Sequence, residues 1–226
     1  MNTGNRNSDS RDRLLYACLA FSGQITASVT HELNNVLGTI DQVAGLLEDL
    51  AATPASEVTV AVERLSTLTD RLNRQTERGV TLTKRLNTFA HMGDHITVEC
   101  NLNDLLENIA GLTQRIANMQ RVELKTTLPN HDITVRTNPL FLSHLLFLCT
   151  KKALSLADRD VVLEIRLSQC DEEAEVTIEA PCHETAADRV QEDDFELLRS
   201  RLPVVITEQL SDEGIRIGVK LSTGGR

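Results

Sequence analysis

Three polar residues that can take part in group transfer, His31, Glu32 and Asn35, lie within five positions of one another. Around them, apolar residues recur every three or four positions, which is typical of an amphipathic helix. These apolar residues are Ile25, Val29, Leu33, Leu37 and Ile40. At about 100° per residue, His31 lies roughly 200° from Val29, away from the apolar side, and Asn35 follows one turn later. The spacing predicts an exposed imidazole beside an acid and an amide, which suits the acceptance of a phosphoryl group.

Two other interpretations of this segment fit it less well. The zinc-protease helix, His-Glu-x-x-His, needs a second imidazole at its fifth position, where this chain has Asn35. An ordinary surface histidine would need no acid and amide arranged around it. We therefore take His31 as the candidate phosphoryl acceptor, with Glu32 and Asn35 as candidate catalytic residues and no metal site.

The composition describes a globular, acidic chain with aliphatic cores. It has 226 residues, of which 41% are hydrophobic and 3% aromatic, without tryptophan. The formal net charge of -10 argues against nucleic acid or an anionic membrane as the partner. No apolar run approaches the roughly 20 residues that span a bilayer, and residues 1–13 lack the hydrophobic region of a signal peptide. We expect a cytoplasmic protein whose five cysteines, without a Cys-x-x-Cys pair, stay reduced.

The first 92 residues predict a helical hairpin behind a short disordered tail, residues 1–10. One long helix is expected from about residue 12 to 50. A second is expected from an N-cap and first-turn pair, Thr53 and Pro54, to about residue 90. Each would be roughly 55–60 Å long. Because a hairpin alone cannot enclose its apolar seam, the pattern favours a homodimer in which two hairpins form a four-helix bundle.

After a linker near residues 92–94, the predicted secondary structure changes to short strands and separate helices. The expected strands are 97–99, 122–128, 133–136, 161–168, 174–179, 204–209 and 215–221, and the expected helices are 103–118, 139–157 and 193–200. Alternating apolar and polar residues in the longer strands indicate an α/β sandwich with helices layered on one face of a sheet.

Taken together, these features resemble the catalytic core of a bacterial sensor histidine kinase, over about residues 11–222. Residues 28–40 resemble the family's phosphoacceptor box, and residues 82–90 resemble the end of its second dimerisation helix. The resemblance implies an α+β chain with two domains. These are a dimerisation and phosphoacceptor hairpin, residues 11–92, and a domain of the histidine-kinase ATPase type, residues 97–222.

The residues that would hold nucleotide depart from the family pattern. The two asparagine positions of its first nucleotide box fall at Leu148 and Lys152, and an ammonium cannot coordinate Mg²⁺. Ala180 and Cys182 occupy the aspartate and first glycine positions of the adenine-reading loop. An acidic stretch, residues 184–194, stands where glycine-rich phosphate loops would be, and it would repel a triphosphate. We expect a domain that has kept its fold and lost ATP, so the chain itself binds no cofactor.

A histidine without its own ATP site must exchange phosphate with a phosphorylated partner, and the resemblance implies response-regulator receiver domains that bring their own Mg²⁺. His31 would be the nucleophile, and Glu32 would accept a hydrogen bond from the other ring N–H. Asn35 would steady the phosphoryl oxygens or a water, and Asn34 and Gly38 would keep the docking surface low and polar. The expected function is that of a histidine phosphotransferase in a two-component phosphorelay.

Two alternatives stay open at the level of sequence. In one, Asn35 orients a water that hydrolyses a receiver's aspartyl-phosphate, and His31 is a bystander. In the other, the chain is a dimeric scaffold that binds receivers and transfers nothing. The sequence leaves the role of the C-terminal domain open.

Overall fold

The computed structural model describes residues 3–52, 58–182, 192–211 and 213–224. The chain begins with a helical hairpin, α1 (Thr3–Ala51) and α2 (Val58–Ala90), followed by a 3-10 turn, η2 (His91–Gly93). Helix α1 begins at Thr3, within the stretch predicted as a disordered tail. Extending a helix that is already nucleated costs little per residue, and no proline interrupts this stretch. The predicted cap pair Thr53 and Pro54 lies outside the described residues.

The inner face of α1 follows a seven-residue repeat rather than the spacing predicted from sequence. Val29, Val36 and Val43 are all buried and are seven residues apart, as in a coiled-coil seam. Leu37, another residue of the predicted apolar stripe, is 60% exposed in the single hairpin. Residues spaced by exactly four rotate steadily around the helix axis. Two helices that pack along their whole length stay in contact at positions that repeat every seven residues.

The C-terminal domain contains a five-stranded mixed sheet with the strand order β2-β4-β5-β7-β6, and a two-stranded sheet of β1 and β3. Its strands are β1 (Val98–Asn101), β2 (Glu123–Thr127), β3 (Thr134–Thr137), β4 (Val162–Cys170), β5 (Glu173–Ala180), β6 (Val204–Ser211) and β7 (Gly214–Ser222). Its helices are α3 (Leu102–Met119), α4 (Pro139–Leu156) and α5 (Glu192–Arg199). Only β2 and β4 are parallel, and the other sheet neighbours are antiparallel. These bounds agree with the predicted elements to within three residues at each end.

Local sequence signals set the starts of the two long domain helices. The side chain of Asn101 accepts hydrogen bonds from the backbone N–H of Asn103 and Asp104 at the start of α3. Asn138 accepts one from the N–H of Phe141 at the start of α4, where Pro139 occupies the first turn. Both are N-caps, which satisfy amides that the first helical turn leaves without partners.

Helix α4 forms the centre of the domain core. In the part of the chain that the structure describes, it is the helix long and apolar enough to cross a membrane by length and composition, with a mean hydropathy of 1.2. However, 67% of that stretch is buried inside the protein. Burial on this scale is expected of the core helix of a folded domain.

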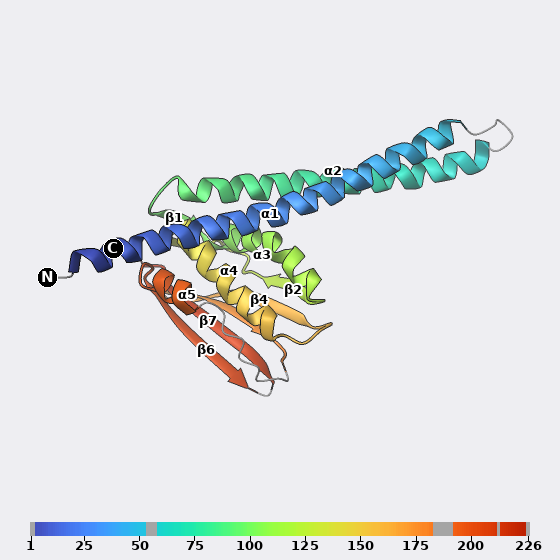
Figure 1. Ribbon diagram of the computed structural model, residues 1–226. Coiled ribbons are helices and arrows are strands. Elements are labelled where there is room, and N and C mark those ends of the chain that lie inside the picture. The colour runs from blue at the N-terminus through green and yellow to red at the C-terminus, as the bar shows by residue number, and fades with distance from the viewer. Residues whose placement is uncertain (1–2, 53–57, 183–191, 212, 225–226) are drawn as a thin grey trace.

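Figure 1 shows three layers, with the hairpin at the top, α3, α4 and α5 in the middle, and the five-stranded sheet at the bottom. The domain lies against the part of the hairpin that contains the N-terminal half of α1 and the C-terminal end of α2. The rest of the hairpin extends beyond the domain. The predicted α+β architecture, with helices on one face of the sheet, is confirmed.

Candidate functional site

His31 lies in the middle of α1, and its side chain is exposed, on the side that the spacing predicts. Asn35, also exposed, places its amide nitrogen 3.3 Å from Nδ1 of the His31 ring. Residues four apart on a helix are neighbours, so α1 alone produces this contact. Because Asn35 occupies the neighbourhood of Nδ1, Nε2 is the ring nitrogen left for chemistry with a docked partner.

Glu32 is positioned by the second helix of the hairpin. Its Oε1 accepts a hydrogen bond from Nη2 of Arg78 at 2.5 Å. The Glu32 side chain is only 12% exposed, whereas that of Arg78 is 51% exposed. The hydrogen bond expected between this carboxylate and the His31 ring is therefore not the interaction that Glu32 makes. Instead, its charge is compensated by a guanidinium that reaches across from α2.

The helices approach each other closely beside this ion pair. A Cβ atom built on Gly79 would lie 3.3 Å from Cγ1 of the buried Val36. The missing side chain lets α2 come near α1 one residue after Arg78, which brings the guanidinium within reach of Glu32. Sequence reasoning missed Arg78 as a site residue. The available signal was a single glycine within an otherwise helical apolar pattern, which often marks a close contact.

Asn34 and Gly38, the residues predicted to form a low docking surface, are both exposed on α1. A Cβ added to Gly38 would meet no atom within 4 Å. Their part in docking stays a prediction. The described surface around His31 is therefore polar and unobstructed on α1.

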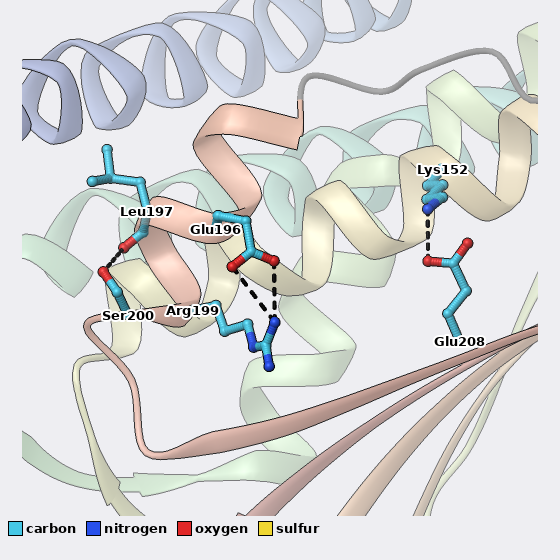
Figure 2. Close-up of polar contacts among 6 residues, drawn as sticks. All are labelled: Lys152, Glu196, Leu197, Arg199, Ser200 and Glu208. Carbon is cyan, nitrogen blue, oxygen red and sulfur yellow. Dashed lines mark hydrogen bonds and ion pairs between the residues drawn. The ribbon is translucent and has the colours of Figure 1, made fainter.

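In the C-terminal domain, the residues at the positions predicted for nucleotide ligands are paired with other side chains or buried. Figure 2 shows Lys152 of α4 pointing to Glu208 of β6, with Nζ and Oε2 2.6 Å apart. Leu148, one turn earlier on α4, is 7% exposed. Ala180 and Cys182 are both buried. The stretch predicted as an acidic loop lies outside the described residues up to position 191, and it is helical in α5 from Glu192.

Helix α5 packs beside α4 and carries its own local contacts. In Figure 2, Arg199 pairs with Glu196 at 3.1 Å, and the Ser200 hydroxyl donates to the carbonyl of Leu197. Leu198 on the same helix is fully buried. The two polar contacts are local to α5, and it is the buried Leu198 that packs the helix into the core.

The hairpin and the C-terminal domain share one hydrophobic core. Phe21 of α1 contacts Phe89 of α2 edge-on, with ring centroids 5.2 Å apart, and contacts Phe147 of α4 at 5.1 Å. His144 of α4 stacks on the same Phe21 ring. Burial lowers the pKa of His144 to about 4, because the charged imidazolium would lose its hydration in this core. His144 is therefore neutral at physiological pH and acts as a packing residue.

No group of three or more histidine, cysteine, aspartate or glutamate side chains in the described ranges is arranged to hold a metal ion. The five cysteines are free, and three of them, Cys18, Cys149 and Cys182, are buried. Burial raises the pKa of Cys149 to about 12, so this thiol stays protonated.

No family model matches the chain, and no curated protein sequence does. Solved structures do match in fold. The Acinetobacter baumannii histidine kinase AdeS is 12% identical, with a TM-score of 0.49 over 86% of this chain and 98% of that one. The cytoplasmic segment of histidine kinase QseC is 16% identical, with a TM-score of 0.47 over 65% of this chain and 94% of that one. Histidine kinase ThkA, in complex with response regulator protein TrrA, is 15% identical, with a TM-score of 0.47 over 95% and 64%.

Proposed function

We propose that this chain is a histidine-containing phosphotransferase that exchanges a phosphoryl group between His31 and the aspartate of receiver domains without binding ATP. One combination of observations carries this proposal. An imidazole is exposed on a helical hairpin, while the residues at the positions predicted for nucleotide ligands are buried or paired within the domain.

The chemistry of those positions supports the loss of ATP. The ammonium of Lys152 cannot coordinate Mg²⁺, and the carboxylate that it binds, Glu208, adds negative charge where phosphates would have to lie. Leu148 offers a buried hydrocarbon in place of an amide oxygen. At these three residues a triphosphate would meet no amide ligand for Mg²⁺ and no uncompensated cation, and the one carboxylate is already paired with Lys152.

The transfer step needs one lone pair on His31 and little else from this chain. Nε2 attacks the phosphorus of the receiver's aspartyl-phosphate, the N–P bond forms, and the P–O bond breaks with its electron pair leaving on the carboxylate. Such transfers depend mainly on positioning and charge compensation, and the receiver supplies Mg²⁺ and a lysine. Arg78 compensates the charge of Glu32, so the carboxylate next to His31 repels the incoming phosphoryl group less.

A homodimer is the form of the protein that we propose acts in this reaction. Leu37 is 60% exposed, and Leu33 and Ile40 beside it are half-buried. The three lie on one flank of α1 because they are four and three residues apart. This flank is turned more than a quarter-turn away from His31 at about 100° per residue. A second hairpin packed there would cover apolar surface and leave the imidazole free.

A direct test is incubation of the full-length protein with candidate receivers phosphorylated on aspartate. We expect label to move to this protein and to survive alkali but not acid, as an N-linked phosphoryl group does. Separately, millimolar ATP with Mg²⁺ should produce no thermal shift and no label. If ATP labels the protein, the proposal fails. If receivers bind but no label moves, the chain is a scaffold.

A phosphatase is the second candidate, and the exposed amide of Asn35 one turn from His31 favours it. An amide at this place could orient a water for in-line attack on a receiver's aspartyl-phosphate. In that case receivers lose phosphate at a rate that does not depend on His31.

A further inference from the structure

The two polar neighbours of His31, Glu32 and Asn35, make their side-chain contacts with different residues of the hairpin. Glu32 is held by Arg78 on α2, with Oε1 and Nη2 2.5 Å apart and the carboxylate only 12% exposed. The two helices also approach closely beside the pair, at Gly79, which follows Arg78 on α2, and Val36, one turn after Glu32 on α1. Glu32 is thus occupied by a cation from the opposite helix, and Asn35 is the side chain whose polar atom lies at Nδ1 of His31.

We propose that Asn35, and not Glu32, is the positioning residue that sets the tautomer of His31. This inference rests on the proposed phosphotransfer, because it concerns how the same imidazole is prepared for it. A neutral imidazole carries one proton, and the nitrogen without the proton has the lone pair. Whatever binds Nδ1 therefore decides whether Nε2 can act as the nucleophile.

An amide suits both states through which a reversible phosphoryl carrier passes. Before transfer, Nδ1 must carry the proton, so that Nε2 has the lone pair, and Oδ1 of Asn35 can accept from Nδ1–H. When the Nε2–P bond forms and the P–O bond of the aspartyl-phosphate breaks, the ring becomes positively charged and Nδ1 releases its proton to water. Nδ1 is then an acceptor, and Nδ2 of Asn35 can donate to it. A half-turn of the amide interchanges the two atoms.

The amide of Asn35 lies 3.3 Å from Nδ1 of His31. Which partner donates in this contact depends on the tautomer of the ring, because a half-turn of the amide exchanges its donor and its acceptor. A carboxylate in the same place could only accept a hydrogen bond. It would favour the Nδ1–H ring in both states, whereas the amide can accept from Nδ1–H before transfer and donate to Nδ1 after it.

Nitrogen-15 NMR of histidine-labelled full-length protein tests this without any partner, with the His31 signals assigned from a His31→Gln sample. In the unmodified protein we expect the Nδ1–H tautomer, which leaves the lone pair on Nε2, to be enriched. Asn35→Leu should change the tautomer ratio roughly two- to tenfold, the range for one net hydrogen bond. Asn35→Asp, which can only accept, should make Nδ1–H the major form. Asn73→Leu, at an exposed position of α2, controls for adding an apolar side chain to the hairpin.

Glu32→Gln tests the opposite assignment, in which Glu32 sets the tautomer. It should leave the ratio as it is, since Glu32 is bound to Arg78. A shift with Glu32→Gln as large as that with Asn35→Leu would overturn the inference, as would a ratio that Asn35→Leu leaves unchanged. If the tautomers respond as expected but no receiver transfers phosphate to His31, the proposed function fails and the positioning role of Asn35 stands.

Discussion

Phe21 on α1 and His144 on α4 stack their rings face to face, with centroids 4.4 Å apart and planes 1° from parallel. Both side chains are buried, at 1% and 3% exposure, and Nδ1 of His144 has no hydrogen-bond partner among the described residues. The contact joins the hairpin to the C-terminal domain through a neutral imidazole. Stability of the two-domain unit should therefore depend on that ring staying uncharged.

Acidification should destabilise the protein through His144. The pKa of His144 is about 4 in the folded chain and about 6.5 when unfolded, because burial disfavours the imidazolium. The free energy of unfolding is therefore highest above pH 6.5, where the imidazole is neutral in both states. It decreases as the pH falls from there towards 4, since only the unfolded chain takes up the proton. Between pH 7 and 5 we expect a loss of about 2 kcal/mol from this residue.

Urea unfolding at the two pH values measures this loss, and His144→Leu provides the comparison. The variant should lose less stability than the unmodified protein over the same interval, by about the 2 kcal/mol assigned to the imidazole. Equal losses in the two proteins would mean that His144 is not the group responsible.

Substitutions at His31 and Asn35 should separate transfer from hydrolysis. His31→Gln removes the nucleophile and should abolish phosphate uptake from a receiver, whereas Asn35→Ala should keep uptake within about fivefold, the worth of one hydrogen bond. Single-turnover transfer with a phosphorylated receiver measures both rates. Unchanged discharge of the receiver by the His31→Gln protein would favour the phosphatase. If neither substitution changes any rate and receivers still bind, the scaffold is favoured.

The ion pair between Lys152 and Glu208 should contribute little stability and no nucleotide affinity. Its two side chains are 29% and 39% exposed, so a double-mutant cycle with alanine at each position should give a coupling of about 0.2–1 kcal/mol. Lys152→Asn would restore an amide at the predicted metal-ligand position, and we expect no thermal shift with Mg²⁺ and ATP, because Leu148 is still there. A clear shift would show that this one lysine is what excludes nucleotide.

Gly79 should tolerate no large side chain. Gly79→Leu would push against Val36, separate the helices and detach Arg78 from Glu32, at a cost of about 1–3 kcal/mol. Gly45 on α1 is the matched control, because a Cβ there would meet nothing within 4 Å. Gly45→Ala should stabilise the helix by up to about 1 kcal/mol. Thermal unfolding of both variants should show shifts of opposite sign, and a neutral Gly79→Leu would contradict the close crossing.

The exposed flank of α1 should control self-association. Leu37→Glu places a charge in the apolar surface that we propose a second hairpin covers, and sedimentation should show a shift from dimer to monomer. Gln24→Glu adds the same charge at an exposed position elsewhere on α1 and should leave the association state as it was. If the unmodified protein is a monomer, or if Leu37→Glu leaves a dimer intact, the proposal that a second hairpin packs on this flank is wrong.

The sequence by itself determined the elements and the exposure of His31. Helical and strand periods, together with the caps at Asn101 and Asn138, act over a few residues, so they can be recognised without knowing what packs where. The same local reasoning placed Asn35 beside His31, since both are on one helix.

Only the tertiary structure decided which residues meet across the hairpin and across the domain junction. Glu32 was assigned to His31 from sequence, but Arg78, 46 residues away along the chain, binds it instead. The stack of His144 on Phe21 and the pairing of Lys152 with Glu208 are also contacts between distant segments. Their geometry depends on the crossing of α1 with α2 and on the order of the strands, which no short-range pattern encodes because a single helix or strand is compatible with many packings.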